Sequence, residues 1–137
     1  MSDKHEDPLF DFEKLDVYQL SLAWLDEFFT LCRTLPRESR YAVGDQLIRA
    51  GLSISNNLAE GVGKSSVKER ARYYGTAINS ARECISILIV LRRQACLSDA
   101  AYHALRGTGR RITAMIYALQ QSLDRQYPAT SLLARRS

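Results

Sequence analysis

Arginine dominates the residues of this chain that could do chemistry. Fifteen of its 19 basic residues are arginine. A guanidinium group carries a planar fork of N–H donors that fits phosphate and carboxylate oxygens, so this bias favours an anionic partner or ion pairs at an interface. The charge is unevenly spread, because residues 1–16 carry −4 and residues 17–137 carry +8. The basic remainder of the chain is therefore the first candidate for a binding surface.

Residues for catalysis or metal binding are scarce. The two histidines are His5 and His103. Asp99 and His103 stand four residues apart, but two ligands do not complete a metal site. No Ser or Cys has a predicted base beside it, and the three cysteines (Cys32, Cys84 and Cys96) form no CxxC pair. The sequence therefore predicts no metal, no cofactor and no catalytic residue, and a protein that is not an enzyme.

Four segments have the apolar spacing of amphipathic helices. They cover residues 15–34 and 39–60, a stretch that opens with a capping box at Ser66, and a stretch that follows Ser98 and Asp99. Short connections between long helices predict an all-α, up-down-up-down antiparallel four-helix bundle. We expect the bundle to span residues 12–126, between a disordered acidic segment (1–11) and a flexible tail (127–137).

Two glycines, Gly107 and Gly109, interrupt the fourth apolar stripe. Glycine in a helix interior costs about 1 kcal/mol relative to alanine. We expect these positions to allow a close approach between helices. A local kink beside a ligand is the alternative.

Bundle topology predicts that many arginines gather at one end. The end of the first helix, the start of the second, the end of the third and the start of the fourth should lie together. The arginines of these segments are Arg33, Arg37, Arg40, Arg92, Arg93, Arg106, Arg110 and Arg111. Such a cluster would suit a phosphate backbone. Alternatively, some of these side chains cap helix C-termini or pair across a subunit contact.

A polar stripe follows one side of the second predicted helix. It consists of Arg49, Ser53, Asn56, Asn57 and Glu60, and the third helix adds Ser80 and Glu83. The stripe is either a solvated face or a polar seam, between two bundles or between the second and third helices. In a seam, Arg49 would pair with a carboxylate, because a buried charge persists only when it is paired.

Several segments together resemble a known family. They are Phe12–Tyr18, Leu35–Tyr41, Gln46–Ala50 and, most specifically, Ser53–Gly61. The chain resembles the four-helix-bundle proteins of the 23S rRNA intervening-sequence family, which includes the accessory variability protein of diversity-generating retroelements. The resemblance implies a homo-oligomer, a ring of five bundles, in the bacterial cytoplasm. It also implies nucleic-acid binding by a basic surface and, from the retroelement member, a reverse transcriptase as a candidate partner.

These observations lead to one functional expectation and one alternative. We expect a non-catalytic nucleic-acid-binding accessory protein for structured RNA or DNA, with phosphate contacts from Arg92, Arg93, Arg106, Arg110 and Arg111. The alternative is a protein-interaction scaffold whose arginines serve subunit contacts. Its polar seam or subunit interface would contain Arg49, Ser53, Asn57, Glu60, Ser80 and Glu83. The longest apolar run is too short to span a bilayer and the N-terminus resembles no signal peptide, so we expect a cytoplasmic protein without a membrane partner.

Overall fold

The structure, a computed structural model, describes residues 7–126. They contain four long helices, α1 (Asp16–Thr34), α3 (Asp45–Val62), α4 (Val67–Arg93) and α5 (Asp99–Gln126). A short 3-10 helix, η2 (Asp11–Lys14), precedes α1. The helix α2 (Arg37–Ser39) and a π-helical turn, η3 (Arg40–Gly44), continue directly into α3. Most of the predicted acidic segment and the whole predicted tail lie outside the described residues.

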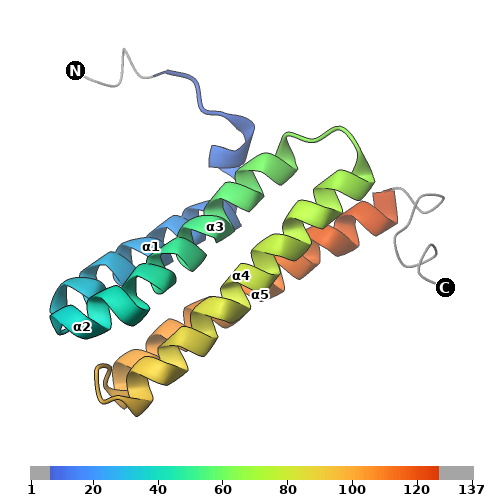
Figure 1. The fold of residues 1–137 in the computed structure, drawn as a ribbon. Coiled ribbons are helices and arrows are strands. Elements are labelled where there is room, and N and C mark those ends of the chain that lie inside the picture. The colour runs from blue at the N-terminus through green and yellow to red at the C-terminus, as the bar shows by residue number, and fades with distance from the viewer. Residues whose placement is uncertain (1–6, 127–137) are drawn as a thin grey trace.

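The four long helices form an antiparallel four-helix bundle, as predicted. Helix α3 packs between α1 and α4, α5 packs beside α4, and α1 closes the ring against α5. Figure 1 shows successive helices running in opposite directions, with α2 and the α4–α5 connection at the same end of the molecule. The described part of the chain contains no strand.

Local signals place the helix ends close to the predicted positions. The Ser66 hydroxyl accepts a hydrogen bond from the Glu69 amide at 3.3 Å, and the Ser98 hydroxyl accepts one from the Ala101 amide at 3.1 Å. Both serines thus satisfy an amide that has no partner within its own helix. The second predicted helix begins two residues earlier than expected, at Arg37, directly after Pro36, which occupies the N-cap position with an extended ψ of 151°.

The core centres on Trp24 and Phe28 of α1, whose rings are fully buried and lie 4.6 Å apart. The Trp24 indole donates a hydrogen bond to the Leu105 carbonyl of α5 at 3.1 Å. Beside it, a Cβ added at Gly109 would lie 2.8 Å from Trp24 Cη2. The close approach of α5 to α1 therefore explains why a glycine occupies position 109. It does not explain Gly107, where an added Cβ would meet nothing within 4 Å.

Candidate nucleic-acid interface

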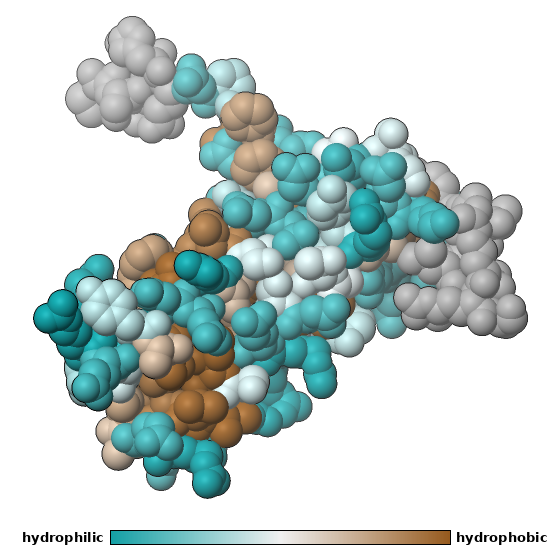
Figure 2. Space-filling model, in the orientation of Figure 1, coloured by the Kyte–Doolittle hydropathy of each residue, from teal (hydrophilic) through white to brown (hydrophobic). Residues whose placement is uncertain are grey.

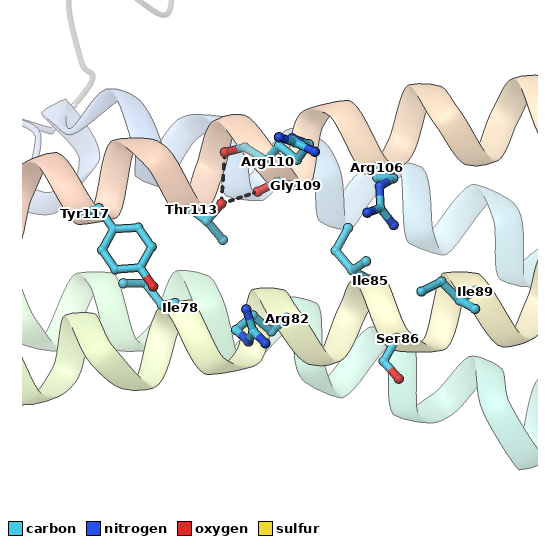
Figure 3. Close-up of a pocket in the computed structure, with 10 residues that line it drawn as sticks. All are labelled: Ile78, Arg82, Ile85, Ser86, Ile89, Arg106, Gly109, Arg110, Thr113 and Tyr117. Carbon is cyan, nitrogen blue, oxygen red and sulfur yellow. Dashed lines mark hydrogen bonds between the residues drawn. The ribbon is translucent and has the colours of Figure 1, made fainter.

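A groove runs along the outer face of the bundle between α4 and α5. Its volume is about 370 Å³. Figure 3 shows its lining: Ile78, Arg82, Ile85, Ser86 and Ile89 from α4, and Arg106, Gly109, Arg110, Thr113 and Tyr117 from α5. Three of these ten residues are arginines and none is acidic. The groove is therefore a cationic surface with an apolar floor.

Helical spacing brings the lining residues together. On each helix they recur every three or four residues, apart from one adjacent pair on each (Ile85–Ser86 and Gly109–Arg110), which places them on one face at 3.6 residues per turn. Gly109 allows the two helices to approach, because a Cβ at this position would lie 2.7 Å from Ile85 Cδ1. Thr113 turns its hydroxyl back to its own helix, donating to the carbonyls of Gly109 at 3.2 Å and Arg110 at 2.9 Å (Figure 3).

A buried tyrosine holds one arginine of the groove in position. Arg106 donates from Nη1 to the Tyr102 hydroxyl at 2.6 Å, and Tyr102 is only 2% exposed. The guanidinium carbon of Arg92 lies 3.9 Å from the centroid of the same ring, and Arg92 Nε lies 4.0 Å from a carboxylate oxygen of Asp99. Arg92 is thus engaged within the bundle, and Tyr102 links it to Arg106.

The groove contains two of the five predicted phosphate-binding residues, Arg106 and Arg110. Arg92 makes the internal contacts just described, and Arg93 and Arg111 are exposed outside the groove lining. Arg106 lies near Arg92, since both guanidinium groups face the Tyr102 ring, but Arg106, Arg110 and Arg111 lie progressively farther from the end of the bundle where they were predicted to gather. They lie seven to twelve residues into α5, or about 10–18 Å along its axis at 1.5 Å per residue.

The other predicted arginines at that end lie on the α1–α3 side. Arg40 serves the capping role that was the alternative, because its guanidinium donates to the carbonyls of Cys32, Arg33 and Leu35 at 3.2–3.3 Å. These carbonyls lie in the last turn and at the C-cap of α1, where carbonyl groups lack the usual helical partners, although the Cys32 carbonyl also accepts from the Leu35 amide at 3.2 Å. Arg37 lies over the Tyr41 ring at 5.9 Å, and Arg33 is exposed.

Charge divides the bundle into two unlike halves. Residues 67–126, which form α4 and α5, hold ten Lys and Arg against four Asp and Glu. Residues 16–62, which form α1 to α3, hold four against six. The groove therefore lies in the basic half.

Among the lining residues that sequence reasoning did not predict for the site are one arginine, Arg82, and one aromatic residue, Tyr117. The sequence contains a pattern that could have identified them. Ile78, Arg82, Ile85 and Ile89 follow a second helical stripe beside the core stripe of α4, and Arg106, Arg110, Thr113 and Tyr117 follow one on α5. Two such stripes on consecutive antiparallel helices would face each other.

Comparison with known proteins places this fold in a family. Residues 13–118 match the family described as 23S rRNA-intervening sequence protein. The chain belongs to this family. The bundle also superposes on a crystal structure from Bacteroides thetaiotaomicron, with a TM-score of 0.70 and 21% identity over 75% of this chain and 93% of that chain. That structure is described as a protein with unknown function from the S23 ribosomal protein family. No curated protein matches the chain.

In this member of the 23S rRNA-intervening sequence protein family, part of the predicted polar stripe joins α3 to α4. The Ser53 and Ser80 hydroxyls lie 2.7 Å apart, and Asn57 Nδ2 donates to the Ser53 carbonyl at 2.7 Å and to its hydroxyl at 3.1 Å. Glu60 lies 3.7 Å from the Lys64 ammonium group, and Glu83 is exposed on α4.

The ion pair that Arg49 would make in a seam between two helices of one bundle is absent from the described residues, and a pair across two bundles stays a prediction. Arg49 is exposed and lines a shallower groove between α1 and α3, together with Asp45. Among residues 7–126, no carboxylate oxygen lies within 4.0 Å of its side-chain nitrogens. The physical reason is its exposure, because a solvated guanidinium needs no partner.

Two cysteines of this family member are held in the protonated form. Burial raises the pKa of Cys84 to about 12, with the negative charge of Glu83 adding to the effect. Burial also raises the pKa of Cys32, and Asp45 adds to it. Because the thiolate is the nucleophile, neither thiol is activated for chemistry near neutral pH.

Residues 7–126 contain no group of three or more His, Cys, Asp or Glu side chains that could hold a metal ion. No helix in this range is long and apolar enough to cross a membrane.

Proposed function

We propose that this protein is a non-catalytic RNA-binding accessory protein that works as a cytoplasmic homo-oligomer. The observation that carries the proposal is the α4–α5 groove, where Arg82, Arg106 and Arg110 line one surface that has no carboxylate among its lining residues. The name of the family refers to an intervening sequence of 23S rRNA, which supports RNA over DNA as the nucleic acid.

Binding of this kind rests on phosphate contacts. Arginine side chains neutralise backbone phosphates and release condensed counterions, which gives affinity without reading base sequence. The exposed Arg93 and Arg111, which lie outside the groove lining, would extend the basic surface beyond the groove. In an oligomer the same surface is repeated, so several weak contacts, one set from each copy, together give a higher overall affinity for one RNA molecule.

Fluorescence anisotropy with a labelled structured RNA tests this proposal. For single-stranded contacts the log–log slope of affinity against salt is about −0.7 per phosphate contact, and for duplex contacts about −0.9. We expect Arg106→Glu with Arg110→Glu to weaken binding and to make this slope shallower. The matched control is Arg33→Glu with Arg37→Glu, two exposed arginines, which changes the net charge equally on the other half of the bundle. Equal losses in both variants, or no RNA binding at low salt, would refute the proposal.

Self-association is the second part of the proposal. Several large apolar side chains are exposed on different helices, including Phe29 of α1, Leu52 of α3 and Val90 of α4, each 42–46% exposed. On the face of the molecule turned to the viewer, Figure 2 shows apolar surface gathered toward the end that holds α2 and the α4–α5 connection. Burial of such surface between copies would stabilise an oligomer, for which we propose a ring of five.

Light scattering at micromolar protein tests the oligomer, and a mass of 15.5 kDa would exclude it. We keep a reverse transcriptase as a candidate partner, to be tested by co-purification of the two proteins.

A protein-interaction scaffold is the second candidate function. It is favoured by the arginines that already serve contacts within the chain, Arg40 at the end of α1 and Arg92 on Tyr102. The two candidates give opposite results in one experiment. A scaffold would remain oligomeric and retain no RNA at low salt, whereas an RNA-binding protein would retain it.

A further inference from the structure

The α4–α5 groove combines a positively charged surface with an apolar and aromatic one, and binding of a phosphate alone would need only the first. Arg82, Arg106 and Arg110 supply positive charge, whereas Ile78, Ile85 and Ile89 supply an apolar floor and Tyr117 supplies an aromatic ring. Figure 3 shows the Tyr117 ring extending from α5 toward α4 above Ile78, and Arg106 extending from α5 toward α4 near Ile85. Tyr117 is 52% exposed, so its ring has a free surface.

The ligand that matches both surfaces is anionic at one part and flat and apolar at another. An RNA duplex presents its phosphates but keeps the faces of its bases stacked inside the helix. An unpaired nucleotide presents a phosphate and a free base together, and unpaired bases commonly stack on aromatic side chains or arginine planes. The volume of the groove, about 370 Å³, lies within the usual range for small-ligand sites.

One arginine is already held for such a ligand. Arg106 is half-buried, and its hydrogen bond to the buried Tyr102 hydroxyl restricts the guanidinium before anything binds. A side chain that is ordered in advance loses less conformational entropy when it meets a phosphate. Its remaining N–H groups are available, because this bond uses only Nη1 of a five-donor group.

We propose that the α4–α5 groove binds unpaired nucleotides of RNA, with a base against Tyr117 and the isoleucine floor and the adjoining phosphates on Arg82, Arg106 and Arg110. This inference rests on the proposed RNA-binding function and adds to it the kind of RNA that is bound. The bound segment is a loop, bulge or single strand. A continuous duplex is not the ligand of this groove.

The test compares two labelled probes, an oligouridine single strand and a blunt RNA duplex of the same length, by fluorescence anisotropy at one salt concentration. We expect the protein to bind the single strand more tightly. We expect Tyr117→Ala to weaken single-strand binding roughly fivefold to a hundredfold, the range for loss of one base–aromatic stack. Duplex binding should stay unchanged, and Tyr117→Phe should bind the single strand like the native protein.

The matched control is Tyr41→Ala, which removes another exposed tyrosine, 64% exposed, that lies in η3 and does not line the groove. An oligomer of abasic residues should bind the native protein as weakly as oligouridine binds Tyr117→Ala. Equal affinity for both probes, or no effect of Tyr117→Ala on the single strand, would overturn this inference and leave RNA binding intact. Failure of both probes to bind would overturn the proposed function as well.

Discussion

Replacement of Gly109 by alanine tests how closely α5 approaches its neighbours. The added Cβ would lie 2.7 Å from Ile85 Cδ1 and 2.8 and 2.9 Å from two carbons of the Trp24 ring. Favourable carbon–carbon contact needs about 3.5–4.0 Å, so a shift on the order of 1 Å is required on two sides.

The end of the Ile85 side chain can turn into the groove, but Trp24 cannot move without cost. Trp24 is fully buried, and its indole is held by the 3.1 Å hydrogen bond to the Leu105 carbonyl. Overpacking of a tight core costs about 1–3 kcal/mol, and loss of this hydrogen bond would add about 1 kcal/mol. The gain in helix propensity from glycine to alanine offsets about 1 kcal/mol. We therefore expect Gly109→Ala to lower the free energy of unfolding by about 1–3 kcal/mol.

Gly107→Ala is the control on the same helix. It receives the same gain in propensity and meets no atom within 4 Å, so we expect it to raise the free energy of unfolding by up to about 1 kcal/mol.

Urea unfolding followed by fluorescence of Trp24, the single tryptophan, measures both variants. If Gly109→Ala were as stable as Gly107→Ala, the close approach at Trp24 would be wrong, and with it the position of α5 that forms the groove.

Three further changes test other parts of the structure. Ala95→Gly should raise the free energy of unfolding by about 1 kcal/mol in a urea titration, because Ala95 lies just after the C-cap of α4 with a φ of 59°, which glycine adopts without strain. A loss of stability would contradict this. Ser53→Ala or Ser80→Ala alone should lower the free energy of unfolding by about 1 kcal/mol, because the two hydroxyl groups hydrogen-bond each other at 2.7 Å. The double variant should lose little more than either single variant, and strictly additive losses would exclude the bond. Stability should fall as pH rises from about 9 toward 12, because the Cys84 thiol ionises near 9.0 when unfolded and near 12 when folded. A Cys84→Ala variant should show a flatter pH profile in the same range, and an unchanged profile would refute this cause.

Much of the fold was predictable because local sequence signals mark the helices and their ends. The apolar spacing, the Ser66 and Ser98 caps and the position of Pro36 act within one turn of a helix, so sequence reasoning located all four helices within about two residues at the ends they mark. The π-helical turn η3 was not predicted. It ends at Gly44, where an added Cβ would lie 3.2 Å from the Cys32 sulfur, a contact between residues of different helices.

The candidate site was predictable only in part. Arg106 and Arg110 were expected to bind phosphate because the arginine-rich segments were expected to meet at one end of the bundle. Their actual neighbours, Arg82 and Tyr117, lie far from that end on their helices, and their importance depends on which side of α4 faces α5. Likewise, sequence spacing could not show that Arg40 turns back onto the carbonyls of α1.

The sequence by itself determined four amphipathic helices, their antiparallel order and the excess of basic residues in the α4–α5 half, because periodicity, helix caps and charge are properties of short segments. Only the tertiary structure decided which arginines share a surface. Successive residues of a helix point about 100° apart, so the partner of each side chain depends on how the helices rotate against one another. That rotation is set by the contact of Gly109 with Trp24 and Ile85, three residues on three different helices.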